Sequence, residues 1–94
     1  MLTRFEWDRE VEAANYLKNG VHFDTAMHVF ADRQAVVRQL RHKDGISVQQ
    51  IVGQINGQVA LIVEFEAEPM PDGRAVETVH IRAARRLGRG ELRL

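Results

Sequence analysis

The dipeptide Asn56-Gly57 constrains the fold of this chain more than any other local feature. Both residues tolerate positive φ, so the pair suits a two-residue turn that joins two antiparallel strands. The segments on either side, 47–55 and 58–68, are rich in β-branched and aromatic residues, a composition typical of strands. The sequence therefore predicts a β-hairpin in the middle of the chain.

Two further strands are expected, one before this hairpin and one after it. The segment 35–40 has strand-like composition and is followed by a turn signal at Lys43-Asp44-Gly45. Two prolines and a glycine within 69–73 interrupt the chain before a last expected strand at 75–82. Because these strands follow one another through short turns, we expect an antiparallel meander.

The N-terminal part of the chain has a different pattern. Residues 2–7 alternate apolar and polar side chains, which predicts a short, half-buried first strand. Asp8 is a suitable N-cap for a helix over Arg9–Asn19. Gly20 is a suitable C′ residue because glycine adopts left-handed backbone angles at little cost. We therefore expect a strand followed directly by a helix.

A second helix, capped by Asp24, is expected over about 25–30. Two short helices joined at Gly20 must cover an apolar surface, which the meander supplies. The predicted fold class is α+β, with the N-terminal strand and two helices packed on one face of an antiparallel meander sheet of about four strands. The side chains expected in the core are Phe5, Trp7, Val11, Leu17, Phe23, Val29, Phe30, Val36, Ile51, Ile55, Leu61, Val63, Phe65, Val79 and Ile81.

The composition fits one soluble domain without disulfides. A chain of 94 residues with 45% hydrophobic and 28% charged residues is typical of a single globular domain rather than a disordered chain. Cysteine is absent, which excludes a disulfide framework and a thiolate metal site. No apolar run approaches the ~18 residues of a membrane span, and the first residues carry charges where a signal peptide is apolar. We expect a single cytoplasmic domain over 1–94 without membrane association.

Charge is balanced in total but not along the chain. Residues 1–32 carry three basic and six acidic groups, whereas residues 33–94 carry ten basic and seven acidic groups. The last thirteen residues hold five arginines against one acid, and a basic tail is expected over about 83–94. Guanidinium binds phosphate oxygens through two parallel hydrogen bonds. This pattern indicates a polyanion site or an acidic protein partner, and a solvated basic chain end is the alternative.

Three carboxylates, those of Glu64, Glu66 and Glu68, alternate along one predicted strand and therefore share one face of the sheet. The first interpretation is the solvent face of an edge strand, where like charges oppose aggregation. Pairing with the C-terminal arginines is the second interpretation, and binding of a hard cation is the third.

The residue types present exclude several catalytic classes. Ser47 is the only serine and has no nucleophile-elbow context, so nucleophilic catalysis by Ser or Cys is not expected. No glycine-rich phosphate loop is present, and the six-residue spacing of His22 and His28 predicts no metal site. A site built from Lys, Arg and His suits metal-independent RNA cleavage, because the 2′-hydroxyl supplies the nucleophile. Lys18, Arg85 and Arg86 are candidate members, although spacing alone favours a surface lysine at a helix C-terminus for Lys18.

Two stretches of the chain resemble a known family. The N-terminal stretch comprises Phe5-Glu6-Trp7-Asp8, Asn15, Lys18-Asn19-Gly20-Val21, Phe23, Ala26, Val29 and Phe30. It resembles the signature of the BrnT toxins, which has F-x-W-D, an Asn, K-H-G-V-x-F and A-x-x-V-F. The C-terminal stretch, Ile81-Arg82-Ala83-Ala84-Arg85-Arg86, resembles the I-I-S-A-R-R segment of the same family.

This resemblance implies a RelE-like fold and a ribonuclease that is the toxin of a type II toxin–antitoxin pair, inhibiting translation without a metal or other cofactor. It implies an RNA substrate and a cognate BrnA-like antitoxin encoded by the adjacent gene. The toxin would form either a homo-oligomer or a heterotetramer with this antitoxin. Lys18 and Arg85 match the family's lysine and functional arginine and are the expected catalytic residues. Arg82, Arg86 and Arg89 are expected to hold the RNA backbone.

Several positions depart from the family pattern, among them three where relatives carry ionisable side chains. Asn19 replaces the histidine of K-H-G, and Gln54 and Gln58 stand where relatives carry Glu before and Arg after the hairpin. Glutamine can hydrogen-bond a phosphate but cannot neutralise it or act as a base. His22, Gln54 and Gln58 are therefore candidates for accessory roles only. The alternative function is a catalytically weak or inactive BrnT-like module that binds an antitoxin or nucleic acid.

Overall fold

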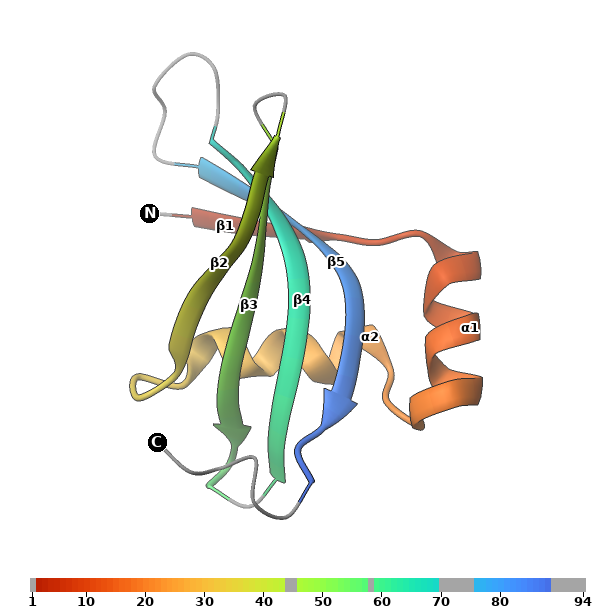
Figure 1. Cartoon of the computed structure of the whole chain (residues 1–94). Coiled ribbons are helices and arrows are strands. Elements are labelled where there is room, and N and C mark those ends of the chain that lie inside the picture. Colours follow the sequence, from red (N-terminus) through yellow and green to blue (C-terminus); the bar gives the residue numbers. More distant parts are fainter. Residues whose placement is uncertain (1, 44–45, 58, 70–75, 89–94) are drawn as a thin grey trace.

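The structure is a computed structural model that describes residues 2–43, 46–57, 59–69 and 76–88. Five strands form one sheet with the order β1-β5-β4-β3-β2 (Figure 1). Their bounds are Leu2–Glu6 for β1, Val36–Lys43 for β2, Ile46–Ile55 for β3, Val59–Pro69 for β4 and Val76–Arg86 for β5. The helices pack against this mostly antiparallel sheet, which confirms the predicted α+β class.

The four C-terminal strands form the predicted meander, and each pairs antiparallel with the next. The N-terminal strand β1 does not lie across the face of this meander. It joins the sheet as an edge strand and pairs parallel with β5, from Leu2 opposite Val76 to Glu6 opposite His80. Since β1 reaches only His80, the second half of β5 has no strand neighbour on that side within the described residues.

Helix α1 spans Arg9–Asn19, as the sequence predicts. The Asp8 carboxylate caps it by accepting hydrogen bonds from the Glu10 and Val11 N–H groups, at 2.8 and 3.2 Å. Gly20 ends it in the left-handed conformation, with φ of 71°. Figure 1 shows α1 standing beside the sheet at its β5 side, whereas the next helical segment crosses one sheet face.

That next segment begins earlier than predicted. Helix α2 spans Phe23–Ala26 and continues as a 3₁₀ helix, η1, over Met27–Ala31. The expected Asp24 cap is wrong, because His22 occupies the N-cap position and makes no side-chain capping bond. Glu12 of α1 supplies the missing acceptor, since its Oε2 accepts the Phe23 N–H at 2.8 Å. A carboxylate from another helix thus sets where α2 begins.

The core lies between the helical segment and the sheet. Phe23, Val29, Val63 and Ile81 are fully buried there. Aromatic rings extend this core in edge-to-face pairs: the centroids of Phe5 and Phe30 are 5.1 Å apart and those of Phe30 and Phe65 are 4.9 Å apart. The remaining core predictions that are confirmed as buried or partly buried are Trp7, Ile51, Ile55, Leu61, Phe65 and Val79.

Three core predictions are wrong. Val11, Leu17 and Val36 are 43%, 87% and 42% exposed. Val11 and Leu17 follow helical spacing, but α1 is docked on the sheet by a polar side chain, Asn15, rather than by an apolar stripe. Val36 lies on β2, one of the two edge strands of the described sheet, and β2 pairs with β3.

The central hairpin is confirmed. Asn56 and Gly57 have φ of 53° and 67°, the positive values that a two-residue turn between β3 and β4 requires. Gly53 is needed for a different reason, because a Cβ there would lie 2.9 Å from the Asp32 carboxylate and 3.0 Å from side-chain atoms of Val29 and Ala35. The backbone of β3 therefore approaches the end of η1 closely.

The last strand runs to Arg86, four residues beyond the expected end at Arg82. The predicted basic tail over 83–94 therefore begins inside β5, and its part at 89–94 lies outside the described residues. Arg82 is the extra residue of a β-bulge, since Ile81 lies opposite Phe65 and Ala83 lies opposite Glu64. Within the described part of the chain, no helix has the length and apolar character needed to cross a bilayer.

Candidate functional site

The side chain of Asn15 joins α1 to the second half of β5, on the side away from β4. Its Nδ2 donates to the Ala84 carbonyl at 2.9 Å, and its Oδ1 accepts the Ala84 N–H at 3.1 Å. One carboxamide thus replaces a neighbouring strand at this residue. Nδ2 also donates to the Val21 carbonyl at 3.1 Å, just after the turn that follows α1. Asn15 is 8% exposed and is the buried polar residue of the described core.

Lys18 lies one helical turn beyond Asn15, in the last turn of α1. Successive residues of a helix are rotated by about 100°, so Asn15 faces β5 and Lys18 stands on one flank of that face. Tyr16 and Glu12 stand on the opposite flank, where they contact the segment that starts α2. Lys18 is exposed to solvent.

Arg85 directly follows the residue that Asn15 holds. The bulge at Arg82 shifts the alternation of β5, so that Ala84 faces the helices and Arg85 points to the other side of the sheet. The Arg85 Nη1 lies 3.4 Å from the Arg86 carbonyl oxygen. That carbonyl points to the same edge as the Ala84 carbonyl, because the two residues are two apart in the strand. The Arg85 guanidinium therefore lies at the edge of β5 where α1 docks.

Arg86 faces the helices and lines a pocket of about 280 Å³. The other walls come from the Gly20-Val21-His22 segment and from the ends of β3 and β4. This pocket unites two predicted residues, Arg86 and His22, on the opposite side of β5 from Arg85. The pocket thus brings His22 and Arg86 together, whereas Lys18 and Arg85 follow the two residues of the Asn15–Ala84 contact by three positions and one position in the sequence.

His22 is held by two neighbours from α1. Its ring stacks on Tyr16, with centroids 4.0 Å apart and planes 15° from parallel. Its Nδ1 lies 4.0 Å from the Glu12 carboxylate oxygen that accepts the Phe23 N–H. The imidazole is exposed to solvent in spite of these contacts. It is therefore oriented but accessible, a combination that a proton-transfer group needs.

Arg82 lies on the sheet face that the helices leave open, where its Nη1 is 3.3 Å from Glu66 Oε1. The second interpretation of the alternating glutamates, pairing with C-terminal arginines, therefore holds for Glu66. The strand that carries these glutamates is β4, the central strand of the sheet and not an edge strand as expected. Arg89 lies outside the described residues.

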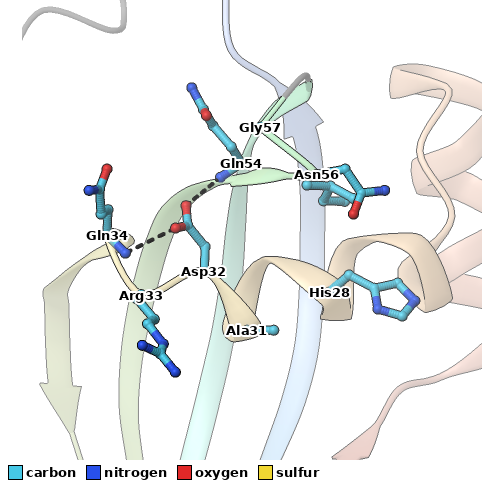
Figure 2. A pocket seen from close by; sticks show the side chains of 9 residues that line it. His28, Ala31, Asp32, Arg33, Gln34, Gln54, Asn56 and Gly57 are labelled. Carbon is cyan, nitrogen blue, oxygen red and sulfur yellow. Dashed lines mark hydrogen bonds between the residues drawn. The ribbon is translucent and has the colours of Figure 1, made fainter.

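Gln54 lines a different pocket, of about 710 Å³, at the far end of η1 (Figure 2). The Asp32 carboxylate anchors this region by accepting hydrogen bonds from the Gln54 N–H at 2.8 Å and the Gln34 N–H at 2.9 Å. Both hydrogen bonds, of which the one from Gln54 has the larger effect, hold the pKa of Asp32 below its usual value. In Figure 2 the side chain of Gln54 points away from Asp32. Gln58, the other predicted glutamine, lies outside the described residues.

Sequence reasoning did not identify what Asn15 and Asn19 do. Asn19 donates an Nδ2–H hydrogen bond to Asn15 Oδ1 at 2.9 Å, so Asn19 supports the docking of α1. The available signal was the four-residue spacing of the two asparagines, which places them on one face of the helix. Asn15 is a structural residue, and Asn19 supports it.

A solved structure has a similar fold. The crystal structure of the Brucella abortus ribonuclease toxin BrnT superposes with a TM-score of 0.57 and 17% sequence identity, covering 94% of this chain and 99% of that chain. This similarity supports a BrnT-like fold. Neither models of protein families nor curated proteins give a match to the sequence.

Proposed function

We propose that this chain is the toxin of a type II toxin–antitoxin pair and cleaves RNA without a metal ion. The BrnT-like fold supports the toxin assignment at the level of a family of folds. The observation that carries the site is the Asn15–Ala84 contact, because it fixes the end of α1 against the end of β5. Lys18 and Arg85 both follow closely on the two residues of that contact.

In the proposed reaction the 2′-hydroxyl of the RNA attacks the adjacent phosphorus, a new P–O2′ bond forms and the P–O5′ bond breaks. Lys18 and Arg85 stabilise the negative charge that develops on the non-bridging oxygens. Arg86, across the strand edge, holds a neighbouring phosphate, and the pocket that it lines accommodates part of the adjacent nucleotide. His22, which is oriented by Tyr16 and Glu12 and open to solvent, is proposed to give a proton to the leaving O5′, and the 2′-hydroxyl loses its proton to solvent. Arg82 contributes less, since Glu66 already pairs with it.

A second function has its own support. Asn19 is engaged by Asn15, and the Gln54 backbone is engaged by Asp32 at a pocket other than the one lined by His22 and Arg86. These contacts do not put Asn19 or Gln54 where either residue could replace the charged side chain that relatives carry at that position. A catalytically weak module that binds an antitoxin or nucleic acid through the same arginines is the alternative. It predicts a stable complex with the product of the adjacent gene and no RNA cleavage.

The test is inducible expression with a readout of RNA integrity, with and without the neighbouring gene. Wild type is expected to arrest growth and degrade RNA, and Lys18→Ala or Arg85→Ala is expected to lower the cleavage rate by ~10²–10³. Arg9→Ala, at the exposed start of α1, is the matched control and should remain toxic. Thermal unfolding checks that each variant is folded. Undiminished cleavage in both variants would exclude this site, and no cleavage by wild type would favour the alternative.

A further inference from the structure

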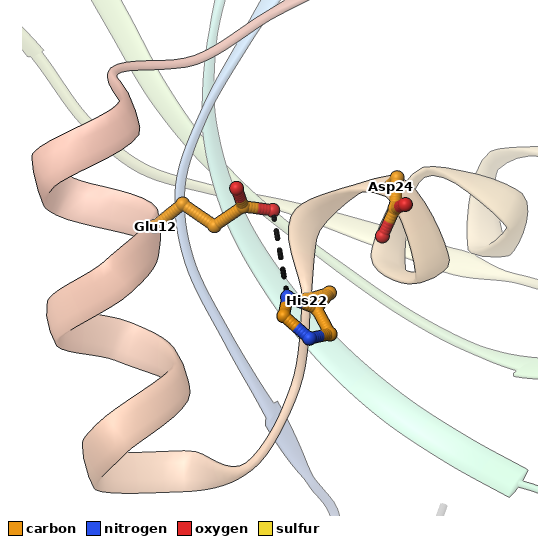
Figure 3. Close-up of side chains that lie close together, drawn as sticks. All are labelled: Glu12, His22 and Asp24. Carbon is orange, nitrogen blue, oxygen red and sulfur yellow. Dashed lines mark ion pairs between the residues drawn. The ribbon is translucent and has the colours of Figure 1, made fainter.

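Three potential metal ligands converge where α1 meets the start of α2. Glu12 comes from α1, whereas His22 and Asp24 flank the first residue of α2, as Figure 3 shows. One ligand atom of each residue lies within 4.8 Å of the ligand atoms of the other two. The spacing of the histidines gives no sign of this group, because Glu12 is brought in by the fold from another helix.

Two of the three side chains are already held in position. Glu12 Oε2 accepts the Phe23 N–H at 2.8 Å, and the ring of His22 stacks on Tyr16 with its Nδ1 4.0 Å from the same carboxylate oxygen. Metal ligands in proteins are commonly fixed by such outer contacts, which set the orientation of the carboxylate and of the imidazole. Asp24 is exposed at the first turn of α2 and points toward His22 in Figure 3.

The chemistry of this donor set favours a divalent transition metal ion. One imidazole nitrogen and two carboxylate oxygens match the ligands that Zn²⁺ takes at ~2.0–2.2 Å, with a fourth position left for water. Ligand atoms around such an ion lie roughly 3–4 Å apart. Rotation of the exposed Asp24 side chain, with small shifts of the Glu12 carboxylate and the His22 ring, closes the difference from the present separations, which reach no more than 4.8 Å. With neutral imidazole the group carries two negative charges, which a divalent ion neutralises.

We propose that Glu12, His22 and Asp24 bind one Zn²⁺ ion that clamps α1 to the start of α2. The ion would lie beside the Gly20-Val21-His22 segment, which walls the pocket lined by Arg86. Its role is to fix that segment. Because His22 is also the proton-transfer group proposed above, a bound ion would occupy that group and is expected to slow RNA cleavage rather than take part in it. The inference stands whether or not the chain cleaves RNA.

The test uses the whole purified chain after removal of metals with a chelator. Titration with ZnCl₂ in a calorimeter is expected to show one saturable site per chain, and saturating Zn²⁺ is expected to raise the thermal midpoint. Substitution of Co²⁺ should give the visible absorption of a cobalt ion held by nitrogen and oxygen ligands.

Variants separate this site from adventitious binding. Glu12→Gln, Asp24→Asn and His22→Phe should each weaken Zn²⁺ binding at least about tenfold, and His22→Phe keeps an aromatic ring against Tyr16. Glu10→Gln and His28→Phe are matched controls, because both residues are exposed and lie outside the cluster. Absence of saturable binding below about 1 mM, or equal loss in the controls, would overturn the proposal, and neither result bears on cleavage of RNA.

Discussion

The carboxamide of Asn15 pairs with both backbone polar groups of Ala84, although the two residues are 69 positions apart in the chain. It donates to the carbonyl at 2.9 Å and accepts from the N–H at 3.1 Å. Beyond His80, no strand of the described part of the chain pairs with β5 on this side, and the Asn15 side chain makes the hydrogen bonds that one residue of such a strand would make. The position of α1, and with it that of Lys18, depends on this pair.

Replacement of Asn15 by alanine should lower the free energy of unfolding by roughly 2–4 kcal/mol, because each buried backbone group left unpaired costs about 1–3 kcal/mol. Asn15→Asp should destabilise at least as much at neutral pH, since it sets a carboxylate against the Ala84 and Val21 carbonyls. Urea unfolding measures both changes. Asn19→Ala, which removes one partly buried hydrogen bond, is the control and should cost less than about 1.5 kcal/mol. A loss for Asn15→Ala no larger than this would contradict the role of Asn15.

Gly53→Ala should destabilise the fold by about 1–3 kcal/mol, as overpacking of a well-packed site does. The new methyl group would meet the Asp32 carboxylate at 2.9 Å and two side-chain carbons at 3.0 Å. Thermal or urea unfolding measures the loss. Gly57→Asn is the comparison, because nothing lies within 4 Å of a Cβ there and asparagine tolerates left-handed angles. If both variants are equally stable, η1 does not approach β3 as closely as described.

Asp32→Asn should lower stability at neutral pH, because the charged carboxylate is the better acceptor for the Gln54 and Gln34 N–H groups. These bonds hold the pKa of Asp32 below its usual 3.8, so the stabilisation is present above that pH. It is lost as the pH falls through the lower pKa of the folded state. Urea unfolding of both proteins at pH 7 and at about pH 3 should therefore show a difference that narrows in acid. A difference that stays constant with pH would exclude this linkage.

Arg86→Ala should weaken binding of a short single-stranded RNA and reduce the slope of log K against log salt by about 0.7, the value for one phosphate contact. Arg82→Ala should change both quantities less, because Glu66 lies 3.3 Å from its guanidinium. Fluorescence anisotropy at several salt concentrations measures both. A non-cleavable 2′-deoxy substitution in the RNA separates binding from cleavage. Equal effects of the two variants would place the RNA on the open face of the sheet as well.

Local sequence signals predicted much of the fold. The Asp8 cap and Gly20 define α1, and Asn56-Gly57 defines the central turn, because each of these features acts through its own backbone. The docking of α1 was not predictable in this way. Helical spacing favours burial of Leu17, but that residue is 87% exposed, since a polar contact to a distant strand decides which side of the helix faces the sheet.

The residue types of the candidate site could be predicted from the sequence. Their arrangement in space could be predicted less well. Simple alternation from Val79 and Ile81 would direct Arg85 toward the helices and Arg86 away from them. The bulge at Arg82 reverses this, so Ala84 is buried and Arg86 lines the pocket with His22. A β-bulge of one extra residue gives no clear signal in the sequence, because its position and its free-energy cost depend on the partner strand.

The parallel pairing of β1 with β5 has a kinetic consequence. The first and last strands of the fold are neighbours, so the sheet gains its β1 edge only after β5 has formed beside β4. Contacts of such high sequence separation slow folding, since loop-closure entropy is lost before they form. During synthesis, a nascent chain that lacks β5 has neither the arginines of that strand nor the Ala84 backbone groups on which α1 docks. Any RNA-cleaving activity would therefore arise only after β5 has left the ribosome and paired with β4 and β1.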